Sequence, residues 1–364
     1  MRSINAILPN CNVRAMEGIL STLGVKGIPI VGLSSVPRCN AFHSQHLCAK
    51  MISPPSTQEN EFIDYLIREV PRGVLFTSDD QTTLLFSKNS HLLKANGFRL
   101  NVPEFDNLRT GFDKWRCYLK AVSLDIPCAF THKIETHADL DHVKTNMPYP
   151  FILKATTLAG GNYFKVYKNS EVDVAYERIL QTIARQQGTV LNPEIMAQEW
   201  LEYDMEDIWC LEAYYDKTGN ARGFMPIRKI RTEIKRDGTY GSRLYAGVSG
   251  ENAELTSLSR KLLDSLHWKG FAHLDWIYSK KRNKYYLTEI NPRLPGFSFF
   301  PSHAGFDMAS YYYFDLTNED FGIPPLKQTL YFEPLRYPGD ISGTLSAILR
   351  RQYSLKKLIS TYCR

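Results

Sequence analysis

Residues 271–296, FAHLDWIYSKKRNKYYLTEINPRLPG, decide the fold of this chain because they are typical of a β-hairpin with one polar face. Residues 274–278 form one strand, and residues 285–291 form the return strand. The basic and polar run 279–284 lies between them as the turn. A turn centred near Arg282 then sets which residues of the two strands face each other.

Two carboxylates and an amide lie on one face of this hairpin. Side chains alternate along a strand, so Glu289 and Asn291 project the same way. The turn places Asp275 opposite Glu289, with their Cβ atoms about 5 Å apart. These groups repel one another unless a cation lies between them, and hard oxygen ligands, some supplied by a phosphate, are what Mg²⁺ prefers. Arg293 adds a fixed positive charge beside this predicted metal site. A solvated face with mixed charges is the alternative.

The composition is that of an ordinary soluble protein of two or three compact units, with 364 residues, 43% hydrophobic and 23% charged. The net charge of +6 is dispersed, which favours anionic small molecules over nucleic acid. No apolar run approaches the ~20 residues of a membrane span, and no signal-peptide core is present, so we expect no transmembrane segment. Seven cysteines without a C-x-x-C pair indicate reduced thiols and a cytoplasmic location.

The N-terminal part of the chain alternates between strand and helix patterns. Strands are predicted over 3–8, 28–33 and 73–77, and helices over 13–23, 62–70 and 84–96. Strands separated by helices indicate a parallel sheet, which binds ligands beyond the carboxyl ends of its strands. Asn10, Ser34 and Asp79 fall at such ends, but no G-x-G-x-x-G follows the first strand. For Asp79 and Asp80, helix N-capping and substrate contact both stay open.

The later elements divide the chain further. They are a helix over 111–122 with Asp113 in its first turn, a strand-rich unit over 129–199, strands over 209–215 and 223–231, a helix over 255–266, and an amphipathic basic helix over 343–362. Pro324 and Pro325 mark a boundary. We therefore expect an N-terminal domain (1–108), a central domain (109–325) with a lid at about 129–199, and a basic tail (326–364). The tail helix packs on its own domain, or else docks on a membrane or a partner.

A phosphate-binding pattern precedes the hairpin. Residues 151–155 form a buried strand that carries Lys154, and the small-residue loop TTLAGGN follows it. Gly160 and Gly161 let the backbone approach a ligand closely, and successive N–H groups in such a loop can hold phosphate oxygens. Most glycine turns are only turns, but a lysine at the strand end can meet the same phosphates.

A hinge for a planar base follows in AQEWLE, residues 197–202. Adenine recognition needs a backbone acceptor, a backbone donor and apolar walls, and an extended segment with Trp200 and Leu201 supplies all three. An ordinary strand with a buried tryptophan is the alternative. Asp207 begins the next strand and is a candidate for a ribose hydroxyl, with Glu206 as the competing choice.

The order of these features resembles the ATP-grasp superfamily of carboxylate–amine ligases. The resemblance runs from Lys114 to Arg293, and its most specific element is EINPR after an Asp-bearing strand. The stretches TSDDQ, EINPRLPGFSFF and HAGFDMASYY look most like the D-aspartate ligase-like branch, which attaches amino acids. The resemblance implies an α/β fold with an N-terminal parallel-sheet domain, a small α+β lid domain and a C-terminal antiparallel-sheet α+β domain.

The resemblance also implies roles for individual residues. Lys114 and Lys154 contact the phosphates of ATP, while the loop at Gly160 and Gly161 closes over them. The other implied contacts are Gln198, Glu199, Trp200 and Leu201 with adenine, and Asp275, Glu289 and Asn291 with two Mg²⁺ ions, for which Mn²⁺ could substitute. The chain departs from the family in having two glycines where some members have four, and Gln198 where a glutamate is common.

The implied reaction joins a small-molecule carboxylate to an amine, with an amino acid as one substrate. The carboxylate attacks the γ-phosphate to give an acyl phosphate and ADP, and the amine then displaces phosphate to form an amide. Arg293 is the candidate for holding the transferring phosphoryl group. Alternation along the strand PIRKIRT places Arg228 on one face and Lys229 and Arg231 on the other. We expect Arg228 or Arg231 to face the site, and favour Arg228.

Two other classes of function compete with a ligase. One is an ATP-binding regulatory or scaffold protein without turnover, which retention of Asp275 and Glu289 argues against. The other is a nucleic-acid binder, which rests only on net charge and the basic tail and ranks last. His273 is a satisfied structural histidine or a contact behind Asp275. The sequence leaves the identity of the substrates and the oligomeric state open, a homodimer being one option.

Overall fold

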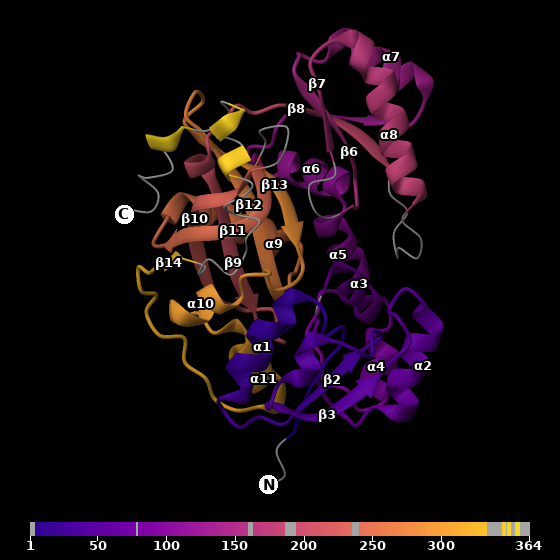
Figure 1. Ribbon diagram of the computed structural model, residues 1–364, viewed down its shortest axis with the longest axis vertical. Coiled ribbons are helices and arrows are strands. Elements are labelled where there is room, and N and C mark those ends of the chain that lie inside the picture. The colour runs from indigo at the N-terminus through magenta and orange to yellow at the C-terminus, as the bar shows by residue number, and fades with distance from the viewer. Residues whose placement is uncertain are drawn as a thin grey trace.

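The computed structural model describes residues 4–77, 79–158, 163–185, 194–234, 240–332, 344–346, 348–350 and 354–356. Within these ranges the chain forms three β-sheets with helices packed on them (Figure 1). The strand orders are β3-β2-β1-β4 in what we call the N-terminal sheet, β5-β8-β6-β7 in the lid sheet, and β13-β12-β9-β10-β11-β14 in the main sheet.

The N-terminal sheet is parallel throughout, as predicted. Its strands are β1 (Asn5–Leu8), β2 (Ile30–Ser34), β3 (Leu47–Ile52) and β4 (Gly73–Leu75), and its helices are α1 (Arg14–Gly24), α2 (Glu59–Glu69), α3 (Asp80–Lys88) and α4 (Ser90–Ala95). Strand β3 was not predicted from the sequence. This strand lies at the sheet edge and alternates between half-buried and exposed residues, so it lacks the apolar run that marks its neighbours.

Helix capping resolves the alternatives for Asp79. Its carboxylate accepts a hydrogen bond from the Thr82 backbone N at 2.7 Å, and its own backbone N donates to Thr82 Oγ1 at 3.2 Å. Asp79 is therefore the N-cap of α3. The single helix predicted over 84–96 is wrong, because Asn89 leaves the helical conformation, with ψ at 18°, and separates α3 from α4.

The helix predicted over 111–122 is also corrected. Helix α5 (Phe105–Phe112) ends before Asp113, and α6 (Lys114–Ser123) begins after it. Asp113 accepts hydrogen bonds from the backbone N of Trp115 and Arg116 at 3.0 and 2.9 Å, so it caps α6 rather than lying in its first turn. This cap places Lys114 at the start of α6, where its backbone N donates to the Thr156 carbonyl at 2.9 Å.

The lid sheet is antiparallel and carries its two helices on one side (Figure 1). Its strands are β5 (Thr131–Ile134), β6 (Phe151–Ala155), β7 (Tyr163–Val166) and β8 (Ile195–Glu199), and its helices are α7 (His137–Asn146) and α8 (Val172–Ala184). A small apolar core around Phe151 and Leu153 joins helices and sheet. The predicted phosphate loop at Gly160 and Gly161 lies outside the described residues.

The main sheet is antiparallel and is covered on both faces. Its strands are β9 (Ile208–Tyr215), β10 (Ala221–Ile234), β11 (Tyr240–Ser249), β12 (Gly270–Ser279), β13 (Lys284–Asn291) and β14 (Leu330–Phe332). Helix α9 (Ala253–Ser265) packs on one face around the buried Trp268 and Trp276. On the other face a second core joins the sheet to α1, α10 (Phe299–His303) and α11 (Met308–Thr317). The N-terminal unit and the main sheet therefore share a core.

The hairpin that opened the sequence analysis has the predicted register. Strands β12 and β13 pair Asp275 with Glu289, and His273 with Asn291. A register shift follows Asp275, and there the Thr288 hydroxyl donates to the Asp275 carbonyl at 2.9 Å. The register sets the metal ligands of the prediction side by side.

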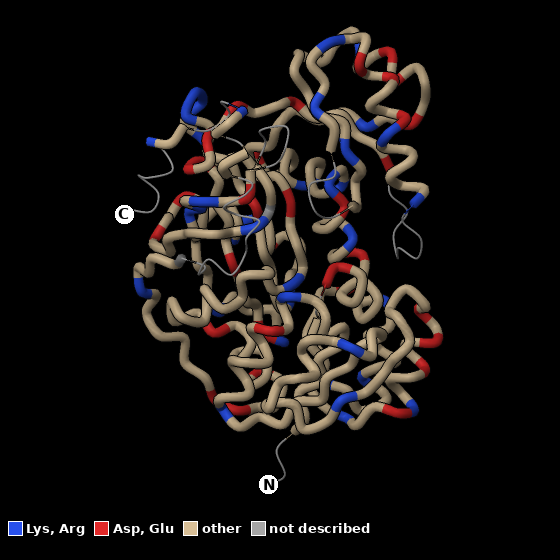
Figure 2. The backbone as a smooth tube through the Cα atoms, in the orientation of Figure 1, with Lys and Arg blue, Asp and Glu red and all other residues tan. Residues whose placement is uncertain are grey.

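The end of the chain returns to the main sheet. Strand β14 pairs with β11, so residues assigned to the tail supply an edge strand. The helix predicted over 343–362 lies largely outside the described residues. Along the described backbone, positions of lysine and arginine are interspersed with positions of aspartate and glutamate (Figure 2). None of the helices in the described ranges has the length and apolar character needed to cross a bilayer.

Candidate active site

The three predicted metal ligands converge on the hairpin. The Asn291 amide nitrogen lies 3.4 Å from Asp275 Oδ2 and 3.4 Å from Glu289 Oε1. The Asp275 and Glu289 side chains keep 19% and 27% of their surface exposed, so both can reach a ligand. Two carboxylates and an amide oxygen are the donor set that fits a hard divalent cation.

Lysines surround these carboxylates. Lys229 Nζ lies 2.8 Å from Asp275 Oδ1, and Lys114 Nζ lies 3.3 Å from Glu289 Oε2. Burial raises the pKa of Asp275, but Lys229 and His273 outweigh it and hold that pKa well below its usual range. Burial also raises the pKa of Glu289, but the positive charge of Lys114 lowers it, and the net result is a lowered pKa. Both carboxylates are therefore charged at neutral pH.

Lys229, rather than Arg228, is the basic residue of β10 that reaches Asp275. Because Lys229 reaches Asp275, its neighbour Arg228 projects to the opposite face of β10, towards α9. Arg231 is buried, and its guanidinium donates to Thr344 Oγ1 at 2.9 Å rather than lining the cavity described below. Neither Arg228 nor Arg231 lines this cavity, and the basic residue of the strand that does is Lys229, between them.

Lys154 lies at the end of β6, where the sequence placed it. It is only 8% exposed, and among the described residues no carboxylate lies within ion-pair distance of its ammonium group. Burial and the charge of Lys114 lower the pKa of Lys154 to about 8. Lys114 also donates from Nζ to the Leu158 carbonyl at 3.0 Å. The site thus holds a buried cation whose environment favours an incoming anion.

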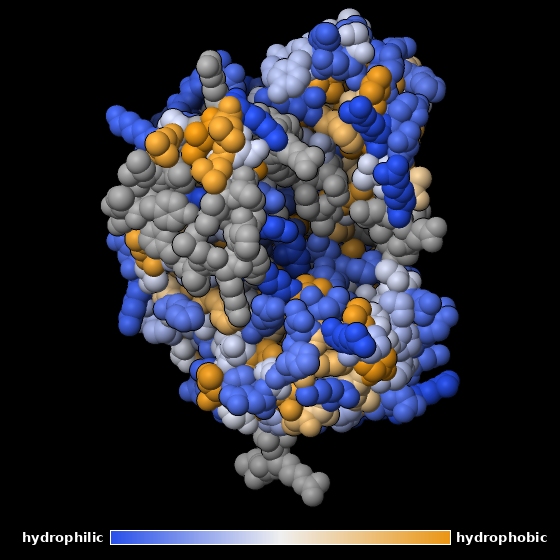
Figure 3. All heavy atoms as spheres, viewed as in Figure 1, coloured by the Kyte–Doolittle hydropathy of each residue, from blue (hydrophilic) through white to orange (hydrophobic). Residues whose placement is uncertain are grey.

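A cavity lies between the lid sheet and the hairpin. In the space-filling view, hydrophilic residues lie in the hollow at the centre of the molecule (Figure 3). The apolar and aromatic residues that line the cavity are Ala129, Ile152, Ala155, Leu158, Tyr163, Trp200, Leu201, Tyr203, Ile208, Tyr240, Trp276, Ile277 and Leu287. Trp200 packs against Tyr203, with ring centroids 5.5 Å apart. At its inner end the same cavity reaches Lys114, Lys154, Lys229 and the two carboxylates. A planar apolar group joined to phosphates matches this lining.

The four predicted hinge residues line the cavity, and two of them also hold neighbouring elements in place. Gln198, Glu199, Trp200 and Leu201 all line the cavity. The Gln198 amide donates to Thr131 Oγ1 at 2.8 Å, so that side chain holds β5 to β8. The Glu199 carboxylate accepts hydrogen bonds from the Arg282 guanidinium. This contact fastens the hinge to the turn of the hairpin.

Asp207 is not among the residues that line the cavity. It ends a short 3₁₀ turn, Met205–Asp207, and its carboxylate accepts from the Asp204 backbone N at 2.9 Å. Its other oxygen lies 2.9 Å from Lys280 Nζ. Asp207 closes a turn in this structure, and its contact with a ribose hydroxyl stays a prediction.

Arg293 joins the metal site to the N-terminal unit. Its Nε lies 3.0 Å from Asp80 Oδ1, and its NH2 group lies 3.4 Å from Asn291 Oδ1. Burial opposes the charge of Arg293, but Asp80 and Glu289 outweigh it and raise the pKa further. Of the pair left open in the sequence, Asp79 caps a helix and Asp80 holds this arginine.

His273 lies behind Asp275 and fits both alternatives left open by the sequence. It is a buried histidine with hydrogen-bond partners, and it contacts Asp275. Its ring contacts Glu212 and Asp275, and burial lowers its pKa while the two carboxylates outweigh that effect and raise it to about 9. Glu212, like Lys229, was not singled out in the sequence. Both lie on inner strands of the main sheet, and only the order of strands shows which residues meet across it.

No protein-family model matches the sequence, and no curated protein sequence does. Solved structures match over most of the chain. The biotin carboxylase domain of a 2-oxoglutarate carboxylase from Hydrogenobacter thermophilus, in complex with MgADP, ADP and bicarbonate, superposes with a TM-score of 0.71 at 13% identity, covering 90% of this chain and 73% of that one.

Two further solved structures give the same result. A carboxyaminoimidazole ribonucleotide synthase from Aspergillus clavatus, complexed with ATP, has a TM-score of 0.68 at 15% identity and covers 90% of this chain and 80% of that one. A biotin carboxylase from Campylobacter jejuni has a TM-score of 0.67 at 14% identity, covering 88% and 72%. Likeness at such low identity shows the fold alone. The predicted three-part α/β architecture is confirmed, and this chain has the ATP-grasp fold.

Proposed function

We propose that this protein is an ATP-dependent carboxylate–amine ligase that forms an amide or peptide bond through an acyl phosphate. One observation carries the proposal. Asp275 and Glu289 line the same cavity as Lys114, Lys154 and Lys229, and the Asn291 amide lies 3.4 Å from both carboxylates. We further propose that one substrate is an amino acid, as the resemblance to the D-aspartate ligase-like branch implies.

The apolar end of the cavity would bind the base of the nucleotide, and the charged end would bind its phosphates. Adenine would lie against Trp200 and Leu201, and the phosphates would reach Lys114 and Lys154. Asp275, Glu289 and Asn291 would hold two Mg²⁺ ions, or Mn²⁺, which neutralise charge on the phosphates when bound. We keep the closing loop at Gly160 and Gly161 as part of the proposal.

The residues of the site then overcome the repulsion between two anions. A substrate carboxylate oxygen bonds to the γ-phosphorus while the bond from that phosphorus to the oxygen of ADP breaks. The amine nitrogen next attacks the acyl carbon, phosphate leaves, and the nitrogen gives up a proton as the amide forms. Arg293 lies beside Asn291 and is placed to hold the phosphoryl oxygens throughout. Lys229 lies 2.8 Å from Asp275 Oδ1 and offsets part of the charge of that carboxylate.

Nucleotide affinity should fall as the pH rises from 7 to 9.5. Lys154 is a cation below its pKa of about 8, and bound phosphates favour that cation, so binding above pH 8 takes up a proton. The affinity for ATP then falls by up to about tenfold per pH unit above that pKa. Calorimetry in buffers of different ionisation enthalpy measures both the affinity and the proton uptake. A flat affinity over this range would contradict the role of Lys154.

A protein that binds ATP on this fold without turnover is the second candidate function. The metal carboxylates and the lysines around them are all present and converge, which favours a working site over a regulatory or scaffold role. A cytoplasmic location and a homodimer stay proposals from the sequence, and no observation favours a nucleic-acid partner.

Phosphate release from Mg²⁺-ATP tests the proposed reaction. Amino acids and other small carboxylates are supplied singly and in pairs with amines, and the nucleotide product is identified by chromatography. We expect release that needs a particular pair and yields ADP. AMP as the product contradicts the acyl-phosphate route. Tight ATP binding without turnover would favour the non-catalytic candidate if it holds for every pair of carboxylate and amine. The pairs tested include nucleotide-linked sugars and peptides.

A further inference from the structure

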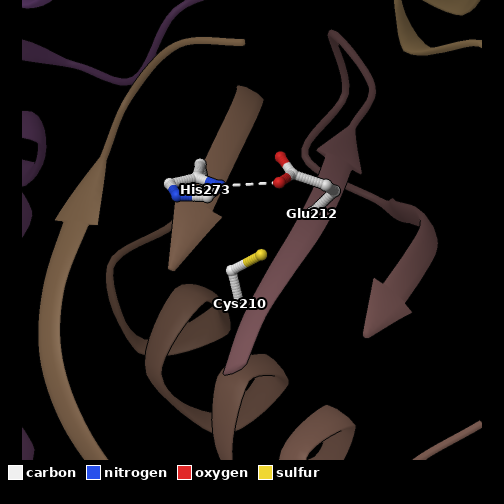
Figure 4. Close-up of side chains that lie close together, drawn as sticks. All are labelled: Cys210, Glu212 and His273. Atoms are coloured by element: carbon white, nitrogen blue, oxygen red, sulfur yellow. Dashed lines mark hydrogen bonds and ion pairs between the residues drawn. The ribbon is translucent and has the colours of Figure 1, made fainter. Parts of the chain in front are cut away.

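Behind the proposed metal ligands lies a buried chain of hydrogen bonds that the reaction outlined above does not use. Glu212 on β9 pairs directly with His273 on β12 across the main sheet. His273 Nδ1 lies 2.6 Å from Glu212 Oε1 (Figure 4). The other ring nitrogen, Nε2, lies 3.2 Å from Asp275 Oδ2. The imidazole therefore joins a buried carboxylate to one that lines the site.

This chain of hydrogen bonds restricts the orientation of the Asp275 carboxylate. Glu212 is fully buried, and a buried carboxylate is costly unless a partner compensates its charge. The contact of Glu212 with Nδ1 fixes the ring of His273 and directs Nε2 towards Asp275 Oδ2. Lys229 holds the other oxygen, Oδ1, at 2.8 Å. Each oxygen of Asp275 therefore has a buried partner, and the two partners together set the plane of the carboxylate.

Cys210 belongs to the same cluster but not to the chain of hydrogen bonds. The ligating atoms of Cys210, Glu212 and His273 lie within 4.8 Å of one another, which raises the alternative of a second metal site (Figure 4). Both nitrogens of His273 already contact carboxylates, so a metal ion would have to break one of these contacts. The hydrogen-bonded arrangement is therefore favoured.

We propose that Glu212 is a positioning residue that acts through His273 to orient the Asp275 carboxylate towards the divalent cation. The proposal rests on the proposed function, because it takes Asp275 as a metal ligand. Partners that hold ligating groups from behind typically change metal affinity or activity by roughly 10–100-fold when they are removed.

Mn²⁺ binding in the presence of ADP, followed by electron paramagnetic resonance, tests this role without any need for turnover. Glu212→Gln keeps the volume and a hydrogen-bonding amide but removes the negative charge. We expect it to bind Mn²⁺ roughly 10–100-fold more weakly than the unmodified protein, with unchanged affinity for metal-free ADP. Cys210→Ala is the matched control, because it alters the same face of β9 outside the chain, and it should bind Mn²⁺ as the unmodified protein does.

If Glu212→Gln does not fold, His273→Gln replaces it as the test variant, because it removes the ring that links Glu212 to Asp275. We expect the same loss of Mn²⁺ affinity from it. Equal Mn²⁺ affinity in the Glu212→Gln variant and the unmodified protein overturns the proposal. An equal loss in both Glu212→Gln and Cys210→Ala indicates a packing defect and overturns it too. Stoichiometric zinc that co-purifies and is lost from Cys210→Ala replaces it with a metal site. If the unmodified ADP complex binds no Mn²⁺ at all, the proposed function itself fails.

Discussion

Glu289→Gln is expected to lower ATP-dependent turnover by about a thousandfold, because several kcal/mol of transition-state stabilisation depend on the metal that this carboxylate would hold. Glu289 faces Asp275 across the hairpin and lies 3.3 Å from Lys114 Nζ. Glutamine has nearly the same volume, so the variant keeps its packing and loses the charge. Steady-state phosphate release at saturating Mg²⁺ measures the effect.

Glu254→Gln is the control for that experiment. Glu254 is exposed in the first turn of α9, on the face of the main sheet away from the site, and its neutralisation should leave turnover unchanged. Circular dichroism and thermal unfolding should show all three proteins folded. Turnover by Glu289→Gln at the rate of the unmodified protein, with the same Mg²⁺ dependence, would remove Glu289 from the metal site.

Lys154→Met should have opposite effects on stability and on nucleotide binding. The folded protein depresses the pKa of this lysine to about 8, so its charge destabilises the ligand-free fold at neutral pH. Between that value and the unfolded pKa the unfolded chain binds more protons, so the stability of the ligand-free protein rises with pH across this window. Removing the charge should raise the unfolding midpoint at pH 7 by at least about 2 °C.

The same substitution should weaken ATP binding by about 10–100-fold, since hydrogen bonds to charged groups contribute about 1.5–3 kcal/mol. Thermal unfolding with and without nucleotide measures both effects in one experiment. Lys144→Met, on the outer side of the lid in α7, is the control and should leave ATP affinity unchanged. A Lys154→Met variant that is less stable but binds ATP normally would make Lys154 a structural residue.

The hairpin was predictable because its information is local. The turn residues and the alternation along 274–291 set the register, and the register alone brings Asp275, Glu289 and Asn291 together. Lys154 was predictable for the same reason, as it ends a short apolar strand directly before a glycine loop. The parallel N-terminal sheet followed from the alternation of apolar strands and helices, and only its edge strand β3 escaped.

The residues that were missed depend on the order of strands in the main sheet. Lys229 reaches Asp275 although β9 lies between their two strands, so alternation along β10 could separate its faces but not say which one meets the hairpin. Glu212 lies on that intervening strand and meets His273 for the same reason. Asp80 pairs with Arg293 across more than two hundred residues of sequence, a contact set by the packing of two units.

Positional isotope exchange in ATP tests the central claim most directly. ATP labelled with ¹⁸O in the β–γ bridge is incubated with Mg²⁺, the protein and one carboxylate at a time, without any amine. If the carboxylate takes the γ-phosphoryl group reversibly, the β-phosphate of bound ADP rotates and the label moves out of the bridge. We predict exchange that requires one class of carboxylate and disappears in Glu289→Gln. Tight ATP binding without exchange under any carboxylate would contradict the acyl-phosphate ligase.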